Sequence, residues 1–282
     1  MFSPTLLSGK RALITGGGTG LGRAMAQRYL ELGATVYICG RRESVLQSTC
    51  ADLAATTGGT IHGFPCDVRD QQAVEQLIDR IWADGPLDIL VNNAAGNFLA
   101  RTEDLSPRAW DAVLGIVLMG TINMTMACGR RWLAAQHSAT VLNIVATYSS
   151  TGSGSGYVVP SAVSKAGVQA LTRSLAVEWG PRGIRLNAIA PGPIPTEGAF
   201  SRLLPMKDLE KLAVQRVPLR RFGTPDELAN LAAFLVSDGA SYINGEVVTM
   251  DGGEWLQGAG EFNYLGQMIT DEQWAMFRSK KS

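Results

Sequence analysis

Short apolar runs alternate along the chain with longer amphipathic stretches, and this alternation predicts strands and helices in turn. The apolar runs predict seven strands, at 11–15, 35–39, 60–64, 87–92, 140–146, 184–190 and 246–250. Stretches with apolar positions at helical spacing predict helices at 21–32, 43–56, 71–82, 107–136, 160–179 and 225–236.

Strict alternation of strands and helices is typical of a parallel sheet with right-handed crossovers. Residues 88–91 form an almost continuous apolar run, as expected when helices cover both faces of a sheet. The sequence therefore predicts an α/β fold of the Rossmann type, a doubly wound seven-stranded parallel sheet with helices on both faces.

No internal repeat or linker divides the chain, so we expect residues 1–282 to form a single domain. Two stretches fall outside the alternation. Residues 193–224 are predicted to cover a substrate, and residues 251–282 form a tail rich in glycine and aromatic residues.

Composition and charge exclude several classes of partner. Lys+Arg and Asp+Glu both number 25, and the sequence pI is about 6.7, which gives no electrostatic reason to expect nucleic acid or a membrane surface. No run of about 18 uninterrupted apolar residues and no signal peptide is found, so we expect a cytoplasmic protein without a membrane partner. Four scattered cysteines and two histidines predict no metal site and no Ser-His-Asp triad.

A glycine-rich turn follows the first predicted strand directly and opens the first predicted helix. Such a turn lets the backbone approach a pyrophosphate, which then accepts hydrogen bonds from the free N–H groups of the helix. The predicted contacts to a dinucleotide are Gly16, Gly17, Gly18, Thr19, Gly20 and Leu21.

The end of the second strand indicates which dinucleotide binds. An NAD site usually has a carboxylate at this position, but here the strand ends in Cys39-Gly40-Arg41-Arg42. A guanidinium suits the 2′-phosphate of NADP, so we predict NADP(H) with Arg41 as the main contact. The alternative is a pair of solvated loop arginines. Asp67 and Val68, after the third strand, are predicted to lie beside the adenine.

These features resemble the short-chain dehydrogenase/reductase family. The resemblance also includes Asn92-Asn-Ala-Ala-Gly96, Pro191-Gly192 and Asp251-Gly-Gly253, and it covers almost the whole chain. It implies that Asn92 braces the fourth strand. It also implies further cofactor contacts at Pro191, Gly192, Ile194 and Thr196.

The family's usual catalytic pattern is Tyr-x-x-x-Lys with a serine about 13 residues earlier, and here the two hydroxyl residues have exchanged places. Four residues before Lys165 stands Ser161, and thirteen residues before Ser161 stands Tyr148. This exchange is similar to the 2,4-dienoyl-CoA reductase branch. Other stretches resemble the same branch, namely 93–98, 156–161, 191–194, 198–202 and 260–263. The chain departs from it in a loop, 149–156, that is about two residues longer, and at Met119, where a polar residue is expected.

The resemblance implies roles for these residues in the reduction of a dienoyl thioester by NADPH. Tyr148 and Asn97 would donate to the thioester oxygen where negative charge develops, and protonation at Cα would give a 3-enoyl-CoA. Lys165 would bind the nicotinamide ribose and Ser161 would orient the phenol. The implied contacts to the acyl-CoA are Arg69, Phe98, Ser106 and Arg202.

Several alternatives remain open from the sequence. The substrate could be a trans-2-enoyl-CoA or a 3-oxoacyl thioester, with Tyr157 as the acid, or the chain could be a non-catalytic NADP-binding scaffold or sensor. Tyr148 could be an exposed loop residue, Asn97 a turn residue and Ser161 a helix N-cap. The resemblance implies a homotetramer. The end at 279–282 is not a peroxisomal Ser-Lys-Leu signal.

Overall fold

The computed structural model describes residues 2–149, 154–196, 207–257, 270 and 272. Its strands are β1 Arg11–Thr15, β2 Thr35–Gly40, β3 Ile61–Pro65, β4 Ile89–Asn92, β5 Ala139–Ile144, β6 Ile184–Pro191 and β7 Val247–Met250. All seven pair in parallel in one sheet with the order β3-β2-β1-β4-β5-β6-β7. The predicted fold class is therefore confirmed, while the single-domain assignment of 1–282 stays a prediction.

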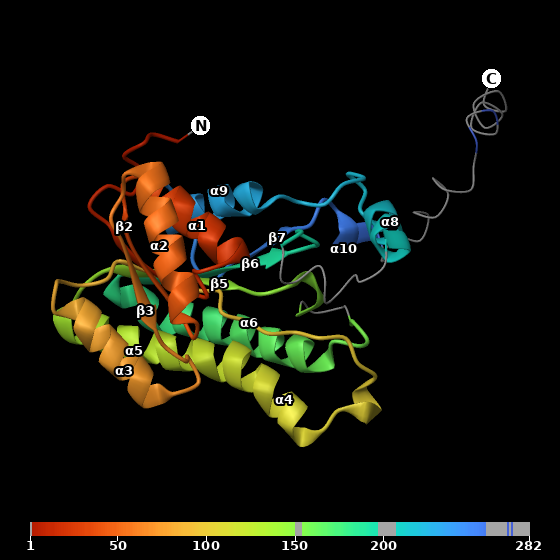
Figure 1. The fold of residues 1–282 in the computed structure, drawn as a ribbon, viewed down its shortest axis with the longest axis horizontal. Coiled ribbons are helices and arrows are strands. Elements are labelled where there is room, and N and C mark those ends of the chain that lie inside the picture. Colours follow the sequence, from red (N-terminus) through yellow and green to blue (C-terminus); the bar gives the residue numbers. More distant parts are fainter. Residues whose placement is uncertain (1, 150–153, 197–206, 258–269, 271, 273–282) are drawn as a thin grey trace.

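Helices cover both faces of the sheet (Figure 1). One face carries α1 Gly20–Glu31, α2 Glu43–Thr57 and α9 Pro225–Val236. The other carries α3 Gln71–Trp82, α4 Pro107–Leu114, α5 Gly120–Ala135 and α6 Val159–Trp179. Each layer has its own apolar core, and successive residues of one strand enter opposite cores. Ala12 and Ile14 of β1 pack under the first layer, whereas Leu13 packs under the second.

The strand order reverses between β1 and β4, and this reversal places the cleft. Chain segments leave the carboxyl ends of these two neighbouring strands toward opposite faces, so a crevice opens between them. The glycine turn follows β1 and the Asn93–Asn97 segment follows β4, so both lie at this crevice.

The long helix predicted at 107–136 is divided by a π-helical turn, Gly115–Met119, between α4 and α5. Such a turn accommodates an extra residue and often lies at a functional site. Here it directs Ile116 into the cleft. The continuous stretch Pro107–Ala135 is long and apolar enough to cross a membrane by length and composition, and half of its most apolar window is buried inside the fold.

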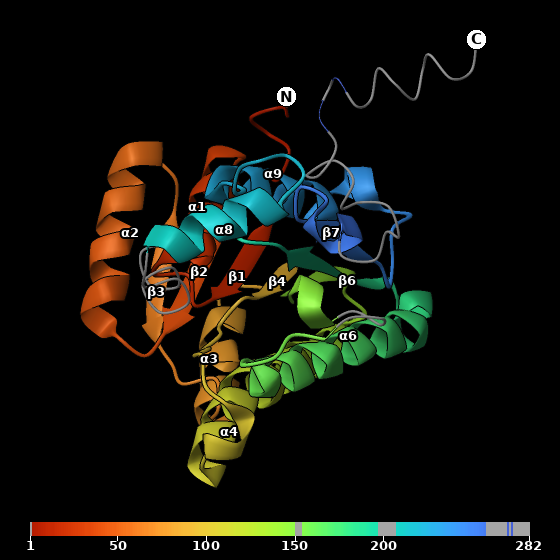
Figure 2. The ribbon, with the colours of Figure 1, turned by 90° about the vertical axis from the view of Figure 1, so that its right-hand side faces the viewer.

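Among the described residues, two α-helices have no counterpart among the predicted elements. α8, Lys207–Arg216, lies within 193–224, on the side of the molecule that faces the viewer in Figure 2. It is too polar for an apolar pattern to reveal it. α10, Glu254–Gln257, is a single turn, and Asp251 caps it by accepting hydrogen bonds from the N–H groups of Gly253 and Trp255 at 2.8 and 2.7 Å.

Candidate active site

The glycine turn after β1 forms a cradle with room for a ligand but not for side chains. Gly16 and Gly20 have φ angles of +66° and +53°, which favour glycine. A Cβ atom on Gly22 would lie 2.3 Å from the carbonyl oxygen of Gly16. Neither the Thr19 side chain nor an acidic residue in the first turn satisfies the N–H groups at the start of α1. These donors therefore fit a pyrophosphate.

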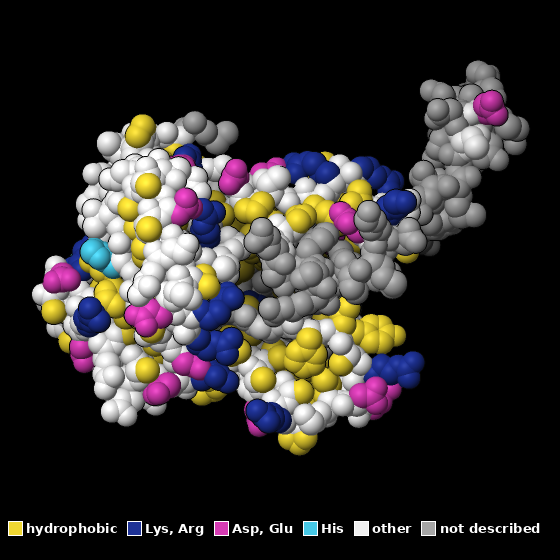
Figure 3. Space-filling model, in the orientation of Figure 1, with side chains coloured by type: hydrophobic (Ala, Val, Ile, Leu, Met, Phe, Trp, Pro, Cys, Tyr) yellow, Lys and Arg dark blue, Asp and Glu magenta, His cyan; other side chains and the backbone are white. Residues whose placement is uncertain are grey.

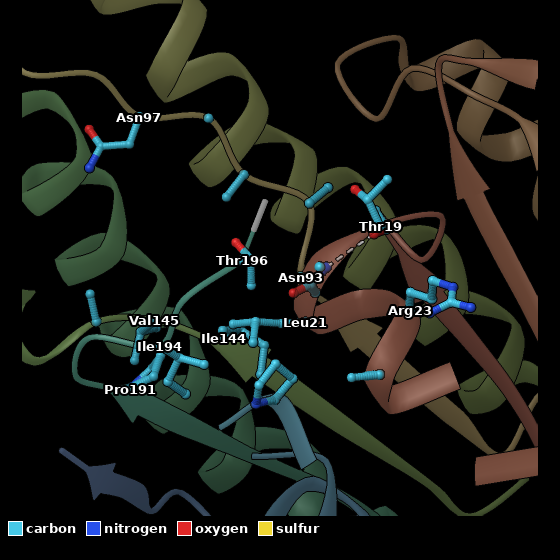
Figure 4. Close-up of a pocket in the computed structure, with 18 of the residues that line it drawn as sticks. Thr19, Leu21, Arg23, Asn93, Asn97, Ile144, Val145, Pro191, Ile194 and Thr196 are labelled. Carbon is cyan, nitrogen blue, oxygen red and sulfur yellow. Dashed lines mark hydrogen bonds between the residues drawn. The ribbon is translucent and has the colours of Figure 1, made fainter. Parts of the chain in front are cut away.

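A second asparagine after β4 holds the cradle in place. Asn93 Nδ2 donates to the carbonyl oxygens of Thr15 and Gly16 at 3.0 and 3.4 Å, while the Thr15 hydroxyl accepts from the N–H of Ala94 at 2.9 Å. In Figure 4, Leu21, Thr196 and Ile194 lie together in the middle of the cleft, and Asn97 lies across open space from them. Sequence reasoning did not assign Asn93, although its place beside Asn92 was a usable signal.

Two arginines and an aspartate line the cleft after β2 and β3. Arg41 and Arg42 follow β2 and line the cleft together with Asp67 and Val68. Arg69 grips the Asp67 carboxylate, with Nε at 2.9 Å from Oδ1 and NH2 at 2.5 Å from Oδ2. This hydrogen bonding lowers the pKa of Asp67, so the carboxylate is charged beside the two arginines.

Two polar side chains from two other segments bond the Tyr148 hydroxyl. Tyr148 lies in a 3-10 turn, Thr147–Ser149, which begins three residues after the end of β5. Its hydroxyl is 3.1 Å from Ser161 Oγ, which comes from the first turn of α6. Asn97 Nδ2, from the segment after β4, donates to the same hydroxyl at 3.4 Å. Tyr148, Ser161 and Asn97 all line the cleft, so the structure brings these predicted residues together.

Burial shifts the acid–base behaviour of the two ionisable residues here. The pKa of the Tyr148 phenol is raised, mainly by burial and against the effect of its hydrogen bond to Ser161, so the phenol is protonated at neutral pH. Burial lowers the pKa of Lys165 to about 8. Lys165 Nζ donates to the carbonyl oxygen of Ile144, the last residue of β5, and also lines the cleft.

Most of the predicted cofactor contacts line the cleft. They are Gly16, Gly18, Thr19, Gly20, Leu21, Arg41, Asp67, Val68, Lys165, Pro191, Gly192, Ile194 and Thr196. Gly17 is not among the described lining residues, and its contact to the cofactor stays a prediction; it is buried, and a Cβ on it would lie 2.4 Å from Ile38 Cγ2. Gly17 therefore permits close packing of the turn on β2.

The predicted acyl-CoA contacts are not part of the described cleft lining. Arg69 is exposed and paired with Asp67, Phe98 follows Asn97 and is half-buried, and Ser106 is the N-cap of α4. Arg202 and the stretches 198–202 and 260–263 lie outside the described residues, as does part of the loop 149–156.

The structure distinguishes between alternative roles that the sequence left open for Ser161, Asn97 and Tyr148. Ser161 is not the N-cap of α6, because Val158 occupies that position. Asn97 is not confined to a local role: its Oδ1 accepts from the N–H of Phe98 at 2.9 Å, and its Nδ2 donates to the Tyr148 hydroxyl at 3.4 Å. Tyr157 is 65% exposed and does not belong to the described lining, so the geometry favours Tyr148 as the acid.

Four charged residues that line the cleft were not predicted, namely Arg23, Arg216, Asp226 and Glu254, and two of them form an ion pair. Arg216 at the end of α8 and Glu254 at the start of α10 both line it, with Arg216 Nε at 3.8 Å from Glu254 Oε1. Burial raises the pKa of Glu254. Glu254 follows the Asp251-Gly-Gly motif directly, which is a signal the sequence offered, whereas no pattern marked Arg216.

The cleft has a volume of about 2060 Å³ and joins the phosphate cradle to the Tyr148 cluster. A pyrophosphate cradle at the strand reversal, together with a protonated phenol and a buried lysine, defines an oxidoreductase that uses a nicotinamide dinucleotide.

Comparisons with known proteins agree with this class. A family model described as enoyl-(acyl carrier protein) reductase matches residues 16–254. A short-chain dehydrogenase structure from Bacillus anthracis str. 'Ames Ancestor' is 43% identical, with a TM-score of 0.79, and the match covers 87% of this chain and 96% of that one. The chain belongs to the short-chain dehydrogenase/reductase family.

Two curated relatives are similar over most of their length. A Bacillus subtilis (strain 168) protein, named a probable (2E)-enoyl-CoA-producing 2,4-dienoyl-CoA reductase, is 48% identical over 88% of this chain and 97% of its own. A Caenorhabditis elegans protein, named probable (3E)-enoyl-CoA-producing 2,4-dienoyl-CoA reductase 3, is 47% identical over 88% of this chain and 81% of its own. The scaffold alternative is therefore wrong, because the chain is an enzyme of this family.

The lowered pKa of Lys165 predicts that burying this residue lowers the free energy of unfolding at neutral pH. At alkaline pH the loss should be smaller. Below pH 8 the lysine is charged in both the folded and the unfolded chain. Between about pH 8 and 10.5 the folded chain releases the proton while the unfolded chain keeps it, so stability contributed by this group rises with pH. The rise is at most about 1.4 kcal/mol per pH unit.

Urea unfolding of the cofactor-free protein and of Lys165→Met at several pH values measures this effect. The free energy of unfolding of the original chain, minus that of the variant, is expected to grow from pH 8 to 10. Because all other ionisable groups are common to both proteins, a constant difference would contradict the lowered pKa.

Proposed function

We propose that the protein reduces 2,4-dienoyl-CoA esters to 3-enoyl-CoA esters with NADPH, in fatty acid β-oxidation. The observation that carries this proposal is the Tyr148 hydroxyl, which lies in the cleft between Asn97 Nδ2 and Ser161 Oγ. The names of the curated relatives support the same substrate class.

The hydrogen bonds around Tyr148 direct its proton toward the substrate. The amide of Asn97 has only hydrogens at Nδ2, so the phenol oxygen accepts in that bond. If Ser161 also donates, both acceptor positions of the phenol oxygen are used, and its own proton is free to bond the thioester oxygen. The second hydrogen on Asn97 Nδ2 is available to the same oxygen.

These donors match the charge that the reaction develops. The bound cofactor supplies a hydride, and a conjugated dienoyl thioester accepts it at C5. The electron pair moves along the conjugated chain to the thioester oxygen, where Tyr148 and Asn97 stabilise the dienolate. A proton added at Cα then leaves a double bond at C3. Lys165 would hold the nicotinamide ribose, and Ser161 would orient the phenol.

We propose that the CoA moiety binds along the outer rim of the cleft, near Arg69, Phe98 and Ser106; the contact expected from Arg202 stays a prediction. Figure 3 shows Lys and Arg side chains gathered on this face between the regions of α2 and α4. Such cations suit the phosphates of CoA. The exposed side of the Arg69 guanidinium can bind a phosphate while Asp67 holds its other side, because 44% of the side chain is accessible.

The choice of NADPH over NADH rests on Arg41 and Arg42. Both are exposed at the adenosine end of the cleft, directly after β2, where an NAD site would have a carboxylate. A guanidinium at this position attracts the extra phosphate of NADP(H).

The proposed chemistry predicts that Tyr148→Phe lowers kcat for a medium-chain trans,trans-2,4-dienoyl-CoA about 100-fold or more, because one oxyanion donor is lost. NADPH oxidation at 340 nm gives the rate, and fluorescence titration should show unchanged NADPH binding. Tyr157→Phe is the matched control and should keep its rate. Full activity in Tyr148→Phe would contradict the proposal.

The substrate and product are tested in the same assay. Matched 2,4-dienoyl, trans-2-enoyl and 3-oxoacyl thioesters are compared, and the dienoyl ester should give the highest kcat/KM. NMR of the product should place its double bond at C3. A double bond at C2 would show protonation at C4 instead and would overturn the 3-enoyl assignment while keeping the dienoyl substrate.

The cofactor proposal predicts that Arg41→Ala raises the KM for NADPH about 10-fold or more and leaves the KM for NADH almost unchanged, because only NADPH carries the 2′-phosphate. Arg173→Ala on the exposed side of α6 removes the same charge away from the cleft and is the control. Equal effects on both cofactors would contradict a 2′-phosphate contact.

We also propose a homotetramer, supported by apolar side chains exposed on packed helices. Met119 in the π-helical turn and Val163 on α6 are each 48% exposed. Sedimentation equilibrium is expected to give four times the chain mass of 30.1 kDa. Met119→Glu should shift the protein toward smaller species, since it places charge on an apolar surface. A monomer in the original protein would contradict this proposal. The cytoplasmic location stays a prediction.

A further inference from the structure

The turn that carries Tyr148 needs side chains to hold it. It spans only Thr147–Ser149, and within it the N–H of Ser149 donates to the carbonyl oxygen of Ala146 at 3.1 Å. A residue inside a long helix is fixed by hydrogen bonds along several turns, whereas a three-residue turn has no such support. The direction of the Tyr148 phenol therefore depends on what fixes its neighbours.

A buried pair of polar side chains fixes the residue next to Tyr148. Gln169 on α6 and Ser149 are 3% and 8% exposed. Gln169 Nε2 donates to Ser149 Oγ at 2.7 Å, and Ser149 Oγ donates to the carbonyl oxygen of Ala146 at 2.5 Å. The Ser149 hydroxyl thus accepts one bond and donates another, and both bonds are shielded from water. Buried bonds of this kind hold their geometry tightly.

The same helix face holds the site at three points. Ser161, Lys165 and Gln169 are spaced four residues apart on α6, so they lie in one row. Ser161 bonds the Tyr148 hydroxyl and Lys165 bonds Ile144 at the end of β5. Gln169 bonds the residue after Tyr148. α6 therefore fixes the segment before Tyr148, its hydroxyl and the segment after it.

We infer that Gln169 is a positioning residue for the reaction, acting through Ser149 to hold the Tyr148 turn in register with Ser161 and Lys165. Gln169 is buried and lies outside the described cleft lining, so it acts on the phenol from the side away from the cleft. The inference rests on the proposed function, because it assumes that the Tyr148 hydroxyl acts on the substrate.

The first test breaks the hydrogen bond between Gln169 and Ser149 from each side. Gln169→Met keeps the length of the side chain and removes the donor, and Ser149→Ala removes the hydroxyl. Each variant should lower kcat for the dienoyl-CoA about 10-fold with little change in the KM for NADPH, because displacing a reacting group costs rate. The double variant should lose no more than the worse single variant, since both changes break one chain of bonds. Fully multiplicative losses would overturn the inference.

The second test asks whether the loss passes through Tyr148. Adding Gln169→Met to Tyr148→Phe should leave the remaining rate unchanged, because the group that Gln169 positions is already gone. A further 10-fold loss in that background would show that Gln169 acts elsewhere and would overturn the inference. Unchanged kcat in Gln169→Met alone would also overturn it.

Ser164→Ala is the matched control for a purely structural effect. Ser164 lies on the same helix, is fully buried and donates to the carbonyl oxygen of Pro160 at 2.7 Å, so its side-chain hydrogen bond stays within the helix. It should lower the melting temperature about as much as Gln169→Met while keeping kcat. An equal loss of kcat in this control would mean that loss of helix stability, rather than of positioning, explains the effect.

A spectroscopic measurement separates failure of this inference from failure of the proposed function. With 3-fluorotyrosine incorporated, the 19F resonance of Tyr148 is assigned by its absence in Tyr148→Phe. Burial raises the pKa of this phenol, so freeing the turn in Gln169→Met should lower its titration midpoint, and Ser164→Ala should not. A shifted titration midpoint in Gln169→Met, together with no dienoyl-CoA turnover in the original protein, would contradict the proposed substrate and leave the positioning role of Gln169 intact. An unchanged titration midpoint would contradict the positioning role of Gln169 and leave the proposed function intact.

Discussion

The site depends on the bond between the Lys165 ammonium and the carbonyl oxygen of Ile144. It ties a helix from one layer to the last residue of a central strand, where the next residues lead to Tyr148. A buried ammonium needs acceptors for its N–H groups, and the carbonyl oxygen of Ile144 supplies one, which links α6 to the end of β5. Lowering of the lysine pKa shows the cost of this burial. Ser161 and Gln169 then act from a helix whose position is already set.

Two buried asparagines, Asn92 and Asn143, also link the strands of the sheet to α6. Asn92 Nδ2 donates to Asn143 Oδ1 at 2.9 Å and to Thr125 Oγ1 at 3.0 Å. Asn143 Nδ2 in turn donates to Thr172 Oγ1 on α6 at 2.8 Å. The chain of bonds links β4, which leads to Asn97, with β5 and α6. The three segments that meet at the Tyr148 hydroxyl are therefore also joined beneath it, away from the substrate.

The sequence predicted what depends on regular spacing. All seven strands were found because apolar runs separated by helical stretches follow directly from burial on two faces, and Ser161 and Lys165 share a helix face by spacing alone. α8 was missed because its stability does not come from an apolar stripe. The Gln169–Ser149 bond joins residues twenty positions apart, one in a helix and one in a turn, and no local pattern reports such a pair. Gly17 packs closely on β2, and a glycine needed for such packing looks the same in sequence as one needed for a ligand.

A phenol from the strand end suits a reaction in which hydride and oxyanion are far apart. In the reduction of a ketone, the carbon that receives hydride carries the oxygen that receives the proton, so donor and nicotinamide must be close. In a dienoyl thioester four carbon–carbon bonds separate C5 from the carbonyl carbon. Tyr148 lies thirteen residues before Ser161 and meets Asn97 from a different segment, so the phenol stands apart from the helix that holds Lys165, while side chains of α6 fix it there. An acid on a short turn can lie farther from the nicotinamide than an acid on the helix, but it lacks the rigidity of a helix. The hydrogen bond between Gln169 and Ser149 supplies part of that rigidity.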